Sequence, residues 1–313
     1  MKICVIGDAP IGTRAIQTLA HAGVEGVMAM ASPEVQVVKR HSPFSAEVYL
    51  MALATSQQVQ KVLTGKQGLL RKAPPGSTVI DLSSGDVTLS RELAVQTRLA
   101  GHHWLEAATS RNPVDEANDS LTLLIGSDEA TVARMSALLD TICTHYLHVG
   151  DAGCGHAAAL ANDYLHAAHL ITTAEAVAMA YRAGVTPQAC IDAINLGAGR
   201  SAVSEVNFPR WVLPGRYDSG ICTGQLRRDL RLARSFVTTL NLPEGLMKAV
   251  FERCQPPELC PADEDDLHHL CDRWLSKVPA QLHSSRLSTP KALTTQSPDT
   301  RAAAISALPD ADH

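Results

Sequence analysis

The chain is organised around a stretch that begins Gly150-Asp151-Ala152-Gly153-Cys154-Gly155 and continues from His156 to Gly184 without proline or internal glycine. Alanine, leucine, isoleucine and methionine dominate this run, so it is predicted to form one largely buried helix. At the rise of an α-helix, the run would be roughly 44 Å long. A helix of that length that is apolar nearly all round lies inside a large domain or between two domains. We therefore expect a single helix, from about Cys154 to Ala183, between two domains.

The first turns of this helix hold most of its polar side chains. His156, Asp163 and His166 fall near one face, because spacings of three, four and seven residues nearly repeat the helix. A polar stripe at the start of a buried helix, directly after a glycine-rich turn, is a candidate active-site wall. The alternative is that the histidines only satisfy neighbouring backbone groups.

The N-terminus has the context of a dinucleotide-binding turn. Lys2–Ile6 is predicted to be a short buried strand, and a helix is expected over Thr13–Ala22. Between them, Gly7-Asp8-Ala9-Pro10-Ile11-Gly12 follows the pattern G-x-G-x-x-G, with Ala9 in place of the middle glycine. That glycine normally lets the pyrophosphate approach the backbone. The helix N-terminus still offers N–H groups to an anion. The alternative is a plain turn between a strand and a helix.

Composition bounds the class of protein. The chain has 313 residues, 45% of them hydrophobic and 19% charged, as expected of a globular protein with room for two domains. A net charge of −5 without a basic cluster argues against a nucleic-acid partner. We expect no signal peptide and no membrane association, because no long uncharged apolar run is present. Eight scattered cysteines are typical of reduced thiols in the cytoplasm.

Two further expectations concern the C-terminal part. Cys254 and Cys260 are too widely spaced for a structural zinc pair, so no metal site is expected. From Ser276 the chain is rich in Ser, Thr, Pro and Ala without apolar periodicity, which predicts a disordered tail over 276–313. The predicted domains are then 1–150, with alternating strands and helices, and 151–275, with helices alone.

Three stretches resemble the β-hydroxyacid dehydrogenase family, which includes the 3-hydroxyisobutyrate dehydrogenases and tartronate semialdehyde reductases and is related to the imine reductases. Gly153–Asp163 is similar to the family's G-x-G-x-x-x-K-x-x-N-N, Leu121–Gly126 to T-L-T-I-M-V-G, and Gln225–Ala233 to L-x-x-K-D-L-x-L-A. The resemblance implies a Rossmann-type α/β domain followed by an all-α domain, joined by the long helix. It also implies a homodimer, an NAD or NADP cofactor and a small-molecule substrate: a carbonyl compound, a hydroxy acid or an imine.

The resemblance also assigns candidate site residues. The family's substrate-binding D-A-P-V-S-G-G corresponds to Glu106–Asn112, so Ser110 survives while Arg111 and Asn112 replace two glycines. Arg111 either binds an anion or is a solvated loop residue. At the family's nicotinamide-side lysine stands Arg228, which with Asp229 could instead be an exposed helical ion pair. The expected cofactor-binding residues are Gly7, Ala9, Pro10, Ile11, Gly12, Ser32, Leu53, Ser84 and Arg228. Because Ala31-Ser32-Pro33 offers the ribose no acid or arginine, weaker cofactor binding is expected.

The position of the family's catalytic lysine is the main departure. Ala159 stands there, beside the retained Asn162, and Asp163 replaces the second asparagine. Reducing a carbonyl requires a proton donor beside the hydride acceptor, which Ala159 cannot supply. We expect His156 to be that donor, with Asp163 second, because both flank Ala159 on nearly the same face. The chain is therefore predicted to be a divergent NAD(P)H-dependent oxidoreductase. The alternative is a non-catalytic family member that binds a ligand or partner subunit.

Overall fold

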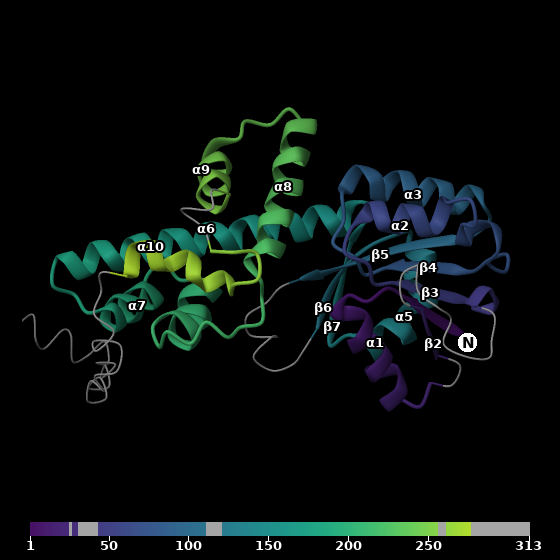
Figure 1. Cartoon of the computed structure of the whole chain (residues 1–313), viewed down its shortest axis with the longest axis horizontal. Helices are drawn as coiled ribbons and strands as arrows, with labels where there is room; N and C mark the ends of the chain where they lie inside the picture. The colour runs from purple at the N-terminus through teal and green to yellow at the C-terminus, as the bar shows by residue number, and fades with distance from the viewer. Residues whose placement is uncertain (25–26, 31–42, 111–120, 256–260, 277–313) are drawn as a thin grey trace, which may run out of the picture.

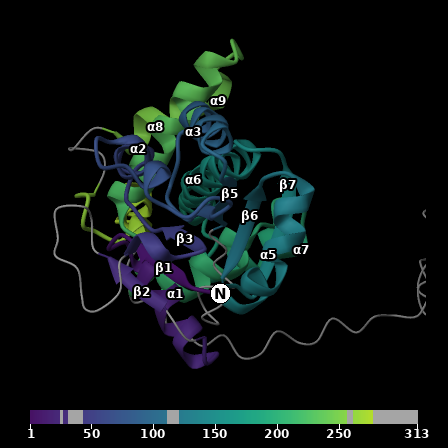
Figure 2. The same ribbon diagram turned by 90° about the vertical axis from the view of Figure 1, so that its right-hand side faces the viewer.

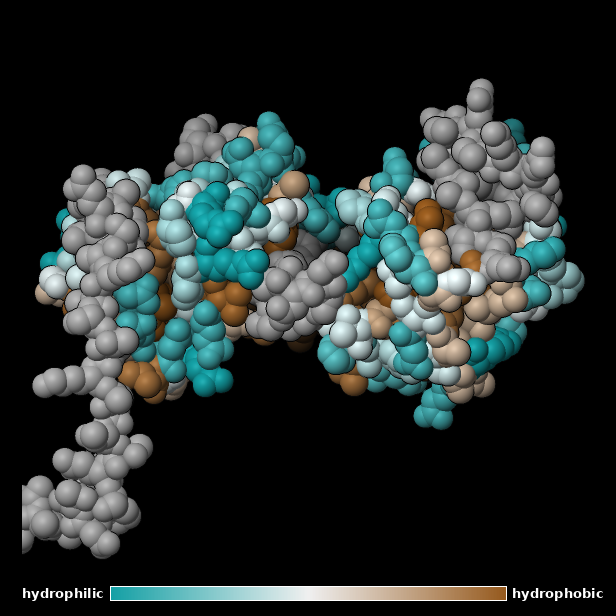
Figure 3. Space-filling view, turned by 90° about the horizontal axis from the view of Figure 1, so that it is seen from below, coloured by the Kyte–Doolittle hydropathy of each residue, from teal (hydrophilic) through white to brown (hydrophobic). Residues whose placement is uncertain are grey.

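The computed structural model describes residues 1–24, 27–30, 43–110, 121–255 and 261–276. They form two lobes (Figure 3), which one long helix joins (Figure 1). Three predicted site residues, Ser32, Arg111 and Asn112, lie outside the described residues, as does the predicted tail beyond Ser276.

The first lobe is built on a seven-stranded sheet with the order β2-β1-β3-β4-β5-β6-β7. All neighbouring strands pair in parallel except β5 and β6, which are antiparallel. The order reverses at β1, which lies between β2 and β3, and such a reversal is where open α/β sheets bind ligands. The strands are β1 (Ile3–Ile6), β2 (Val27–Met30), β3 (Val48–Met51), β4 (Thr78–Asp81), β5 (His103–Ser110), β6 (Thr122–Gly126) and β7 (His145–Gly150).

Helices cover both faces of the sheet (Figure 2). One hydrophobic cluster packs α1 and α5 against the first face, and another packs α2 and α3 against the second. The four helices are α1 (Pro10–His21), α2 (Ser56–Thr64), α3 (Val87–Leu99) and α5 (Glu129–Ile142). The predicted Rossmann-type domain is confirmed. One helix starts earlier than expected, at Pro10 rather than Thr13, because proline has no N–H to lose at the first helical position.

Helix α6 (Cys154–Arg182) is one unbroken helix of 29 residues, as predicted. It leaves the sheet and runs along the whole helical lobe (Figure 1). Gly153 caps its N-terminus with φ +92°, a conformation that side chains with a Cβ rarely adopt. Within the described part of the chain, no helix is both long and apolar enough to cross a bilayer.

The second lobe is helical and packs around the C-terminal two thirds of α6. One cluster joins Leu170, Ala174 and Val177 of α6 to α7 and to the π-helix Val203–Val212; another joins α6 to α8 and α9. Thr186 caps α7 by accepting the N–H of Ala189 at 3.3 Å. The all-α domain is thus confirmed. Its remaining helices are α7 (Pro187–Leu196), α8 (Thr223–Thr239), α9 (Gly245–Cys254) and α10 (Asp272–Leu275).

Candidate active site

The glycine turn after β1 is held tightly against the end of β3. Gly7 has φ +124°, and a Cβ on it would lie 2.0 Å from the carbonyl oxygen of Ala52. The N–H of Ala9 donates to that same oxygen at 3.1 Å. A side chain at position 7 would therefore push the turn off the sheet. Ala9 itself has φ −62° and ψ 146°, which alanine adopts without strain.

A cleft of about 620 Å³ lies between the two lobes, beside this turn. Its size is that of an ordinary small-molecule or cofactor site. Both domains contribute to it, and seven of the residues predicted from the sequence line it. These are Ala9, Pro10, Ile11, Leu53, Ser84, Ser110 and Arg228. Gly7 and Gly12 belong to the turn, but neither is among the described residues that line the cleft.

Sequence reasoning missed several residues of this cleft. Arg14, in the second turn of α1, lines it, and so does the segment Ser219–Cys222 from the helical lobe. Arg14 could have been noticed, since a cation soon after a glycine turn suits a phosphate. Ser219–Cys222 belongs to no recognisable motif, and only the packing of the two lobes brings it here.

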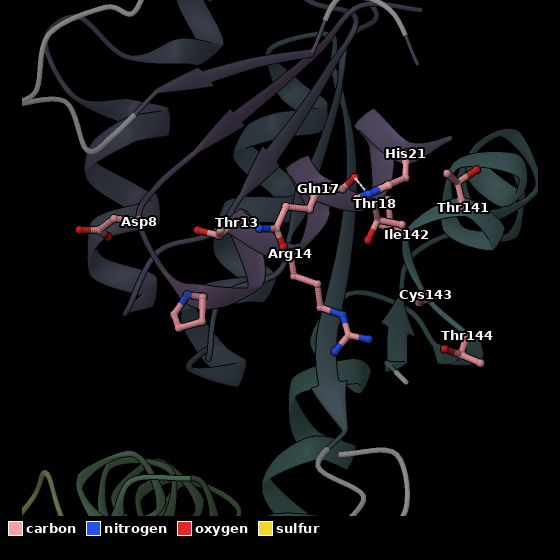
Figure 4. A pocket seen from close by; sticks show the side chains of 11 residues that line it. Asp8, Thr13, Arg14, Gln17, Thr18, His21, Thr141, Ile142, Cys143 and Thr144 are labelled. Carbon is pink, nitrogen blue, oxygen red and sulfur yellow. Dashed lines mark hydrogen bonds between the residues drawn. The ribbon is translucent and has the colours of Figure 1, made fainter. Parts of the chain in front are cut away.

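A second hollow, of about 880 Å³, lies on the sheet domain next to the cleft. Figure 4 shows Gln17 and His21 on α1 and, across from them, Thr141 and Thr144 at the end of α5. The two hollows share Asp8, Pro10 and Arg14, so they meet at the N-terminal turns of α1. Arg14 therefore places a positive charge where the two hollows meet, close to the N-terminus of α1, which also favours an anion.

A small cavity of about 20 Å³ adjoins the cleft at its inner end. His156, Ala159 and Asp163 form one wall of it, as their spacing on α6 predicted, and Asp229 of α8 contributes another side chain. Ser84 and Thr109 line both the cavity and the cleft. Asn162 is half-buried and is absent from the described linings of both.

His156 is buried, with 1% of its surface exposed, and both ring nitrogens face protein groups. Nε2 donates to the carbonyl oxygen of Ser83 at 3.0 Å, and Nδ1 lies 3.3 Å from the carboxylate of Glu106. The backbone of Ser83 is thus satisfied by the ring, which matches the alternative interpretation of this histidine. His156 remains a candidate acid, but its ring is engaged in a buried ion pair.

Glu106, on β5, is the centre of that buried group. It is fully buried and accepts the backbone N–H groups of Gly153 at 2.8 Å and His156 at 2.9 Å, together with the hydroxyl of Ser90. Its carboxylate therefore sits at the N-terminus of α6, where unpaired N–H groups and the helix dipole favour negative charge. This side chain therefore ties the first turn of α6 to β5.

His156 and Glu106 shift each other's pKa values in opposite directions. Burial would lower the pKa of His156, but the hydrogen bond and charge of Glu106, with the charge of Asp81, raise it to about 9. Burial would raise the pKa of Glu106, yet the hydrogen bond and charge of His156 and the Ser90 hydroxyl hold it below its usual range. His156 is therefore an imidazolium at neutral pH and Glu106 a carboxylate.

Two glycines allow this close approach, Gly155 in the first turn of α6 and Gly85 before α3. A Cβ on Gly155 would lie 2.6 Å from the carbonyl oxygen of Leu124 and 2.9 Å from Glu106 Oε1. A Cβ on Gly85 would lie 2.3 Å from the His156 ring. Distances below about 3 Å leave no room for a methyl group. Packing against β5 and β6 thus requires the second glycine of the G-x-G pattern, whereas the first, Gly153, has positive φ and faces the Arg91 side chain.

Arg228 and Asp229 form an ion pair at 3.7 Å, but not the exposed pair that was considered. Asp229 is only 1% exposed and faces the small cavity, whereas Arg228 lines the cleft. The exposed-pair interpretation was wrong because α8 packs this face against α6. Among the described residues, no group of three His, Cys, Asp or Glu side chains could hold a metal ion.

Comparison with known proteins covers both lobes. Residues 2–150 match the family model described as the NAD binding domain of 6-phosphogluconate dehydrogenase. Residues 153–267 match the model described as NAD-binding of NADP-dependent 3-hydroxyisobutyrate dehydrogenase. The departures at Ala9 and Ala159 therefore lie within two matched domains.

Individual relatives are more distant. An uncharacterized oxidoreductase of Synechocystis sp. is 28% identical over 73% of this chain and 75% of its own length. The mitochondrial 3-hydroxyisobutyrate dehydrogenase of Mus musculus is 28% identical over 63% of this chain and 61% of its own length. The structure of Mycobacterium tuberculosis 3-hydroxyisobutyrate dehydrogenase with L-serine has the same fold, with a TM-score of 0.76 and 23% identity over 87% of this chain and 98% of that one. The chain therefore belongs to the β-hydroxyacid dehydrogenase family, a family of NAD(P)-dependent oxidoreductases.

Proposed function

We propose that this protein is an NAD(P)H-dependent reductase whose reaction takes place where the small cavity meets the cleft. The observation that carries the proposal is that the two share Ser84 and Thr109, so a ligand in the cleft would end beside a ligand in the cavity. The reduced cofactor would supply a hydride there. The position of the cleft at the reversal of strand order, beside the N-terminus of α1, supports this assignment.

The residues of the cleft fit a dinucleotide with two negative charges. The turn 7–12 presents the N-terminus of α1, on which no side-chain cap is formed. Arg14 and Arg228 bring two guanidinium groups to the same cleft. We propose that the Arg14 guanidinium binds the pyrophosphate and so offsets the weaker backbone approach that Ala9 allows. Leu53 and Ser84 would lie against the nicotinamide end.

The cavity favours one class of substrate, a protonated imine. Its described lining contains two buried acids, Asp163 and Asp229, the second of which is paired with Arg228. The charge of the His156 ring in the same wall is paired with Glu106, and Ala159 stands at the position of the family's lysine. A carbonyl needs both a hydride and a proton, whereas an iminium ion needs the hydride alone. The hydride forms the new C–H bond at carbon, and the π pair of the C=N bond moves to nitrogen to give a neutral amine. A carboxylate would stabilise the cation before transfer.

The proposal is tested in two steps. Titration with NADH and NADPH, followed by fluorescence or calorimetry, measures cofactor binding directly. Consumption of the reduced cofactor is then compared for two substrates. One is a cyclic imine that is protonated at neutral pH, and the other is a semialdehyde, the aldehyde whose reduction gives a 3-hydroxy acid. We expect faster turnover of the imine. Faster reduction of the semialdehyde would contradict the assigned substrate class.

The second candidate is a cofactor-binding protein without catalysis. The size of the cavity favours it, because about 20 Å³ holds about one water molecule rather than a substrate. A reductase would have to enlarge this space by moving the two lobes apart. Tight cofactor binding with no turnover of either substrate class would support this second candidate.

Replacing Ala9 by glycine should tighten cofactor binding. Ala9 lines the cleft at the helix N-terminus, where a methyl group keeps the pyrophosphate from the backbone. We expect a dissociation constant lower by about tenfold, which corresponds to about 1.4 kcal/mol. The control is Ala54→Gly, the same change at a lining residue that does not belong to the turn 7–12. If Ala9→Gly leaves an already low-micromolar affinity unchanged, the turn is not the limiting contact.

We also propose that the protein is a homodimer formed through α6. Leu165 and Met179 are 50% and 72% exposed, and they lie about four turns apart on the exposed face of α6, which also carries His169, Thr172 and Glu175. Leu165→Asp should shift the chain to monomer in light scattering, whereas Leu99→Asp, at an 83% exposed position on α3, should not. A monomeric wild type would contradict the proposal. The domain limits 1–150 and 151–275 and a cytoplasmic location stay predictions.

A further inference from the structure

The helical lobe contributes one loop to the cofactor cleft. The loop 213–222 joins the π-helix Val203–Val212 to α8, and its last four residues, Ser219–Cys222, line the cleft. Gly220 has φ +83°. A loop of this kind holds one shape only if other parts of the chain fix it.

Asp266 fixes the loop at Ser219. One carboxylate oxygen, Oδ2, accepts both the backbone N–H of Ser219, at 2.7 Å, and its hydroxyl, at 2.6 Å. Backbone hydrogen bonds support the contact, since the N–H of Leu267 donates to Ile221 at 2.9 Å. Two hydrogen bonds to one charged oxygen make this the strongest side-chain contact of the loop.

His268 in turn holds the carboxylate. Its Nδ1 donates to the other oxygen, Asp266 Oδ1, at 2.7 Å, and the ring is fully buried and stacked on Trp211 at 5.0 Å. Nε2 accepts from the amide of Asn207 at 2.7 Å. Because Nε2 accepts this hydrogen bond, Nδ1 carries the proton and donates it toward Asp266. A second amide contact reaches His166 on α6 at 3.2 Å. Burial raises the pKa of Asp266, but the bonds from His268 and Ser219 outweigh it and lower the pKa well below its usual range.

A similar contact holds the middle of the loop. The hydroxyl of Tyr217 donates to Asp272 Oδ1 at 2.6 Å. Nδ1 of His269 is hydrogen-bonded to the other carboxylate oxygen, Asp272 Oδ2, at 2.8 Å. The Tyr217 and His269 rings stack at 4.1 Å. Tyr217 has φ +45°, a conformation that costs roughly 1 kcal/mol or more for a residue with a Cβ. The two successive histidines thus each orient an acid that holds the loop in a strained shape.

We propose that Asp266, oriented by His268, is a positioning residue that holds Ser219–Cys222 as the wall of the cleft and thereby sets the affinity for the cofactor. The inference rests on the proposed use of the cleft for NAD(P)H. Asp266 itself does not touch the cleft in the described structure, so it acts only through Ser219. Releasing the loop would leave the wall with several conformations, and a ligand would have to select one of them.

The test uses the full chain and two measurements. Asp266→Asn removes the charged oxygen, Ser219→Ala removes one of the two bonds, and Ser219→Thr keeps the hydroxyl. Asp218→Asn is the matched control, because this loop carboxylate is bonded to Arg216 on the surface. Amide hydrogen exchange of peptides covering 217–222 is measured without cofactor, and NADH and NADPH affinities are measured by fluorescence.

We expect both Asp266→Asn and Ser219→Ala to speed exchange of the loop and to weaken cofactor binding by about tenfold. Ser219→Thr should keep the exchange of the loop near that of the wild type, and Asp218→Asn should keep both values. Faster exchange with unchanged affinity would overturn the inference, as would unchanged exchange. If the wild type binds no cofactor, the proposed function fails together with this inference, whereas equal affinities of wild type and variants overturn the inference alone.

Discussion

His156→Ala should lower the free energy of unfolding by roughly 3–5 kcal/mol, because it leaves the Glu106 charge buried without its counter-ion. The acid is fully buried, and its imidazolium partner lies 3.3 Å away. Urea denaturation followed by circular dichroism measures the loss. The matched control is His169→Ala, an exposed histidine on the same helix, which should change stability by less than about 0.5 kcal/mol.

A double variant separates the charge effect from the loss of packing. His156→Gln combined with Glu106→Gln removes both charges and keeps similar volumes. Its loss of unfolding free energy should be smaller than the sum of the losses of the two single variants, since no uncompensated ion is left buried. A loss below about 1 kcal/mol for His156→Ala would mean that Glu106 is neutral in the native protein.

The same ion pair predicts how stability depends on pH. Because folding raises the pKa of His156 from 6.5 to about 9, its contribution is complete below pH 6.5 and is lost as the pH rises through about 9. Glu106 has the opposite sign, so its contribution is present above its ordinary pKa and is lost in acid. We expect the wild type to lose on the order of 3 kcal/mol between pH 6.5 and 10. In His156→Gln, this alkaline loss should be absent.

Asp163→Asn should lower kcat on an iminium substrate by about 10²- to 10⁴-fold, with little change in cofactor affinity. Asp163 lines the small cavity and is 5% exposed, so its charge acts where water is largely excluded. The reason is that a neutral amide does not stabilise the cation as a carboxylate does. Steady-state kinetics on the imine, with cofactor binding measured separately, checks both parts. Glu175→Gln, an exposed acid on the same helix, is the control.

On a semialdehyde, whose reduction requires a proton as well as a hydride, two outcomes bear on the identity of the acid. If Asp163→Asn keeps full activity while a folded His156→Gln loses it, His156 is the donor that the sequence first suggested. If both keep full activity, neither residue is the acid. Ala159→Lys offers the converse experiment, since it restores the family's proton donor beside the same cavity. It should raise turnover of a semialdehyde, provided that the cofactor still binds.

The glycine turns show how far local sequence can predict this site. Gly7 and Gly153 have positive φ, and both could be identified from the strand–turn–helix context without any tertiary information. The run after Gly155 likewise predicted the long α6, because it is rich in helix-forming residues and has no proline or internal glycine. The spacing on that helix also brought His156, Ala159 and Asp163 to one cavity wall.

The chemistry of that wall depended on residues far away in the chain. Nothing near His156 in the sequence indicates that Glu106, fifty residues earlier, takes its imidazolium as a partner. The sequence spacing of two ionisable groups says nothing of their distance across a sheet, and that distance decides whether a histidine is free to act as an acid. The burial of Asp229 could not be predicted from the sequence for the same reason.

By itself, then, the sequence predicted the alternation of strands and helices before residue 150, the helices after it, the glycine turns and the length of α6, because these follow from local backbone preferences and from hydrophobic periodicity. Only the tertiary structure decided which charges meet. It joined Glu106 to the N-terminus of α6, brought Ser219–Cys222 into the cleft, and left about 20 Å³ beside Asp163. Those outcomes arise from contacts between distant segments, whose electrostatic and packing energies have no counterpart in any short stretch of the chain.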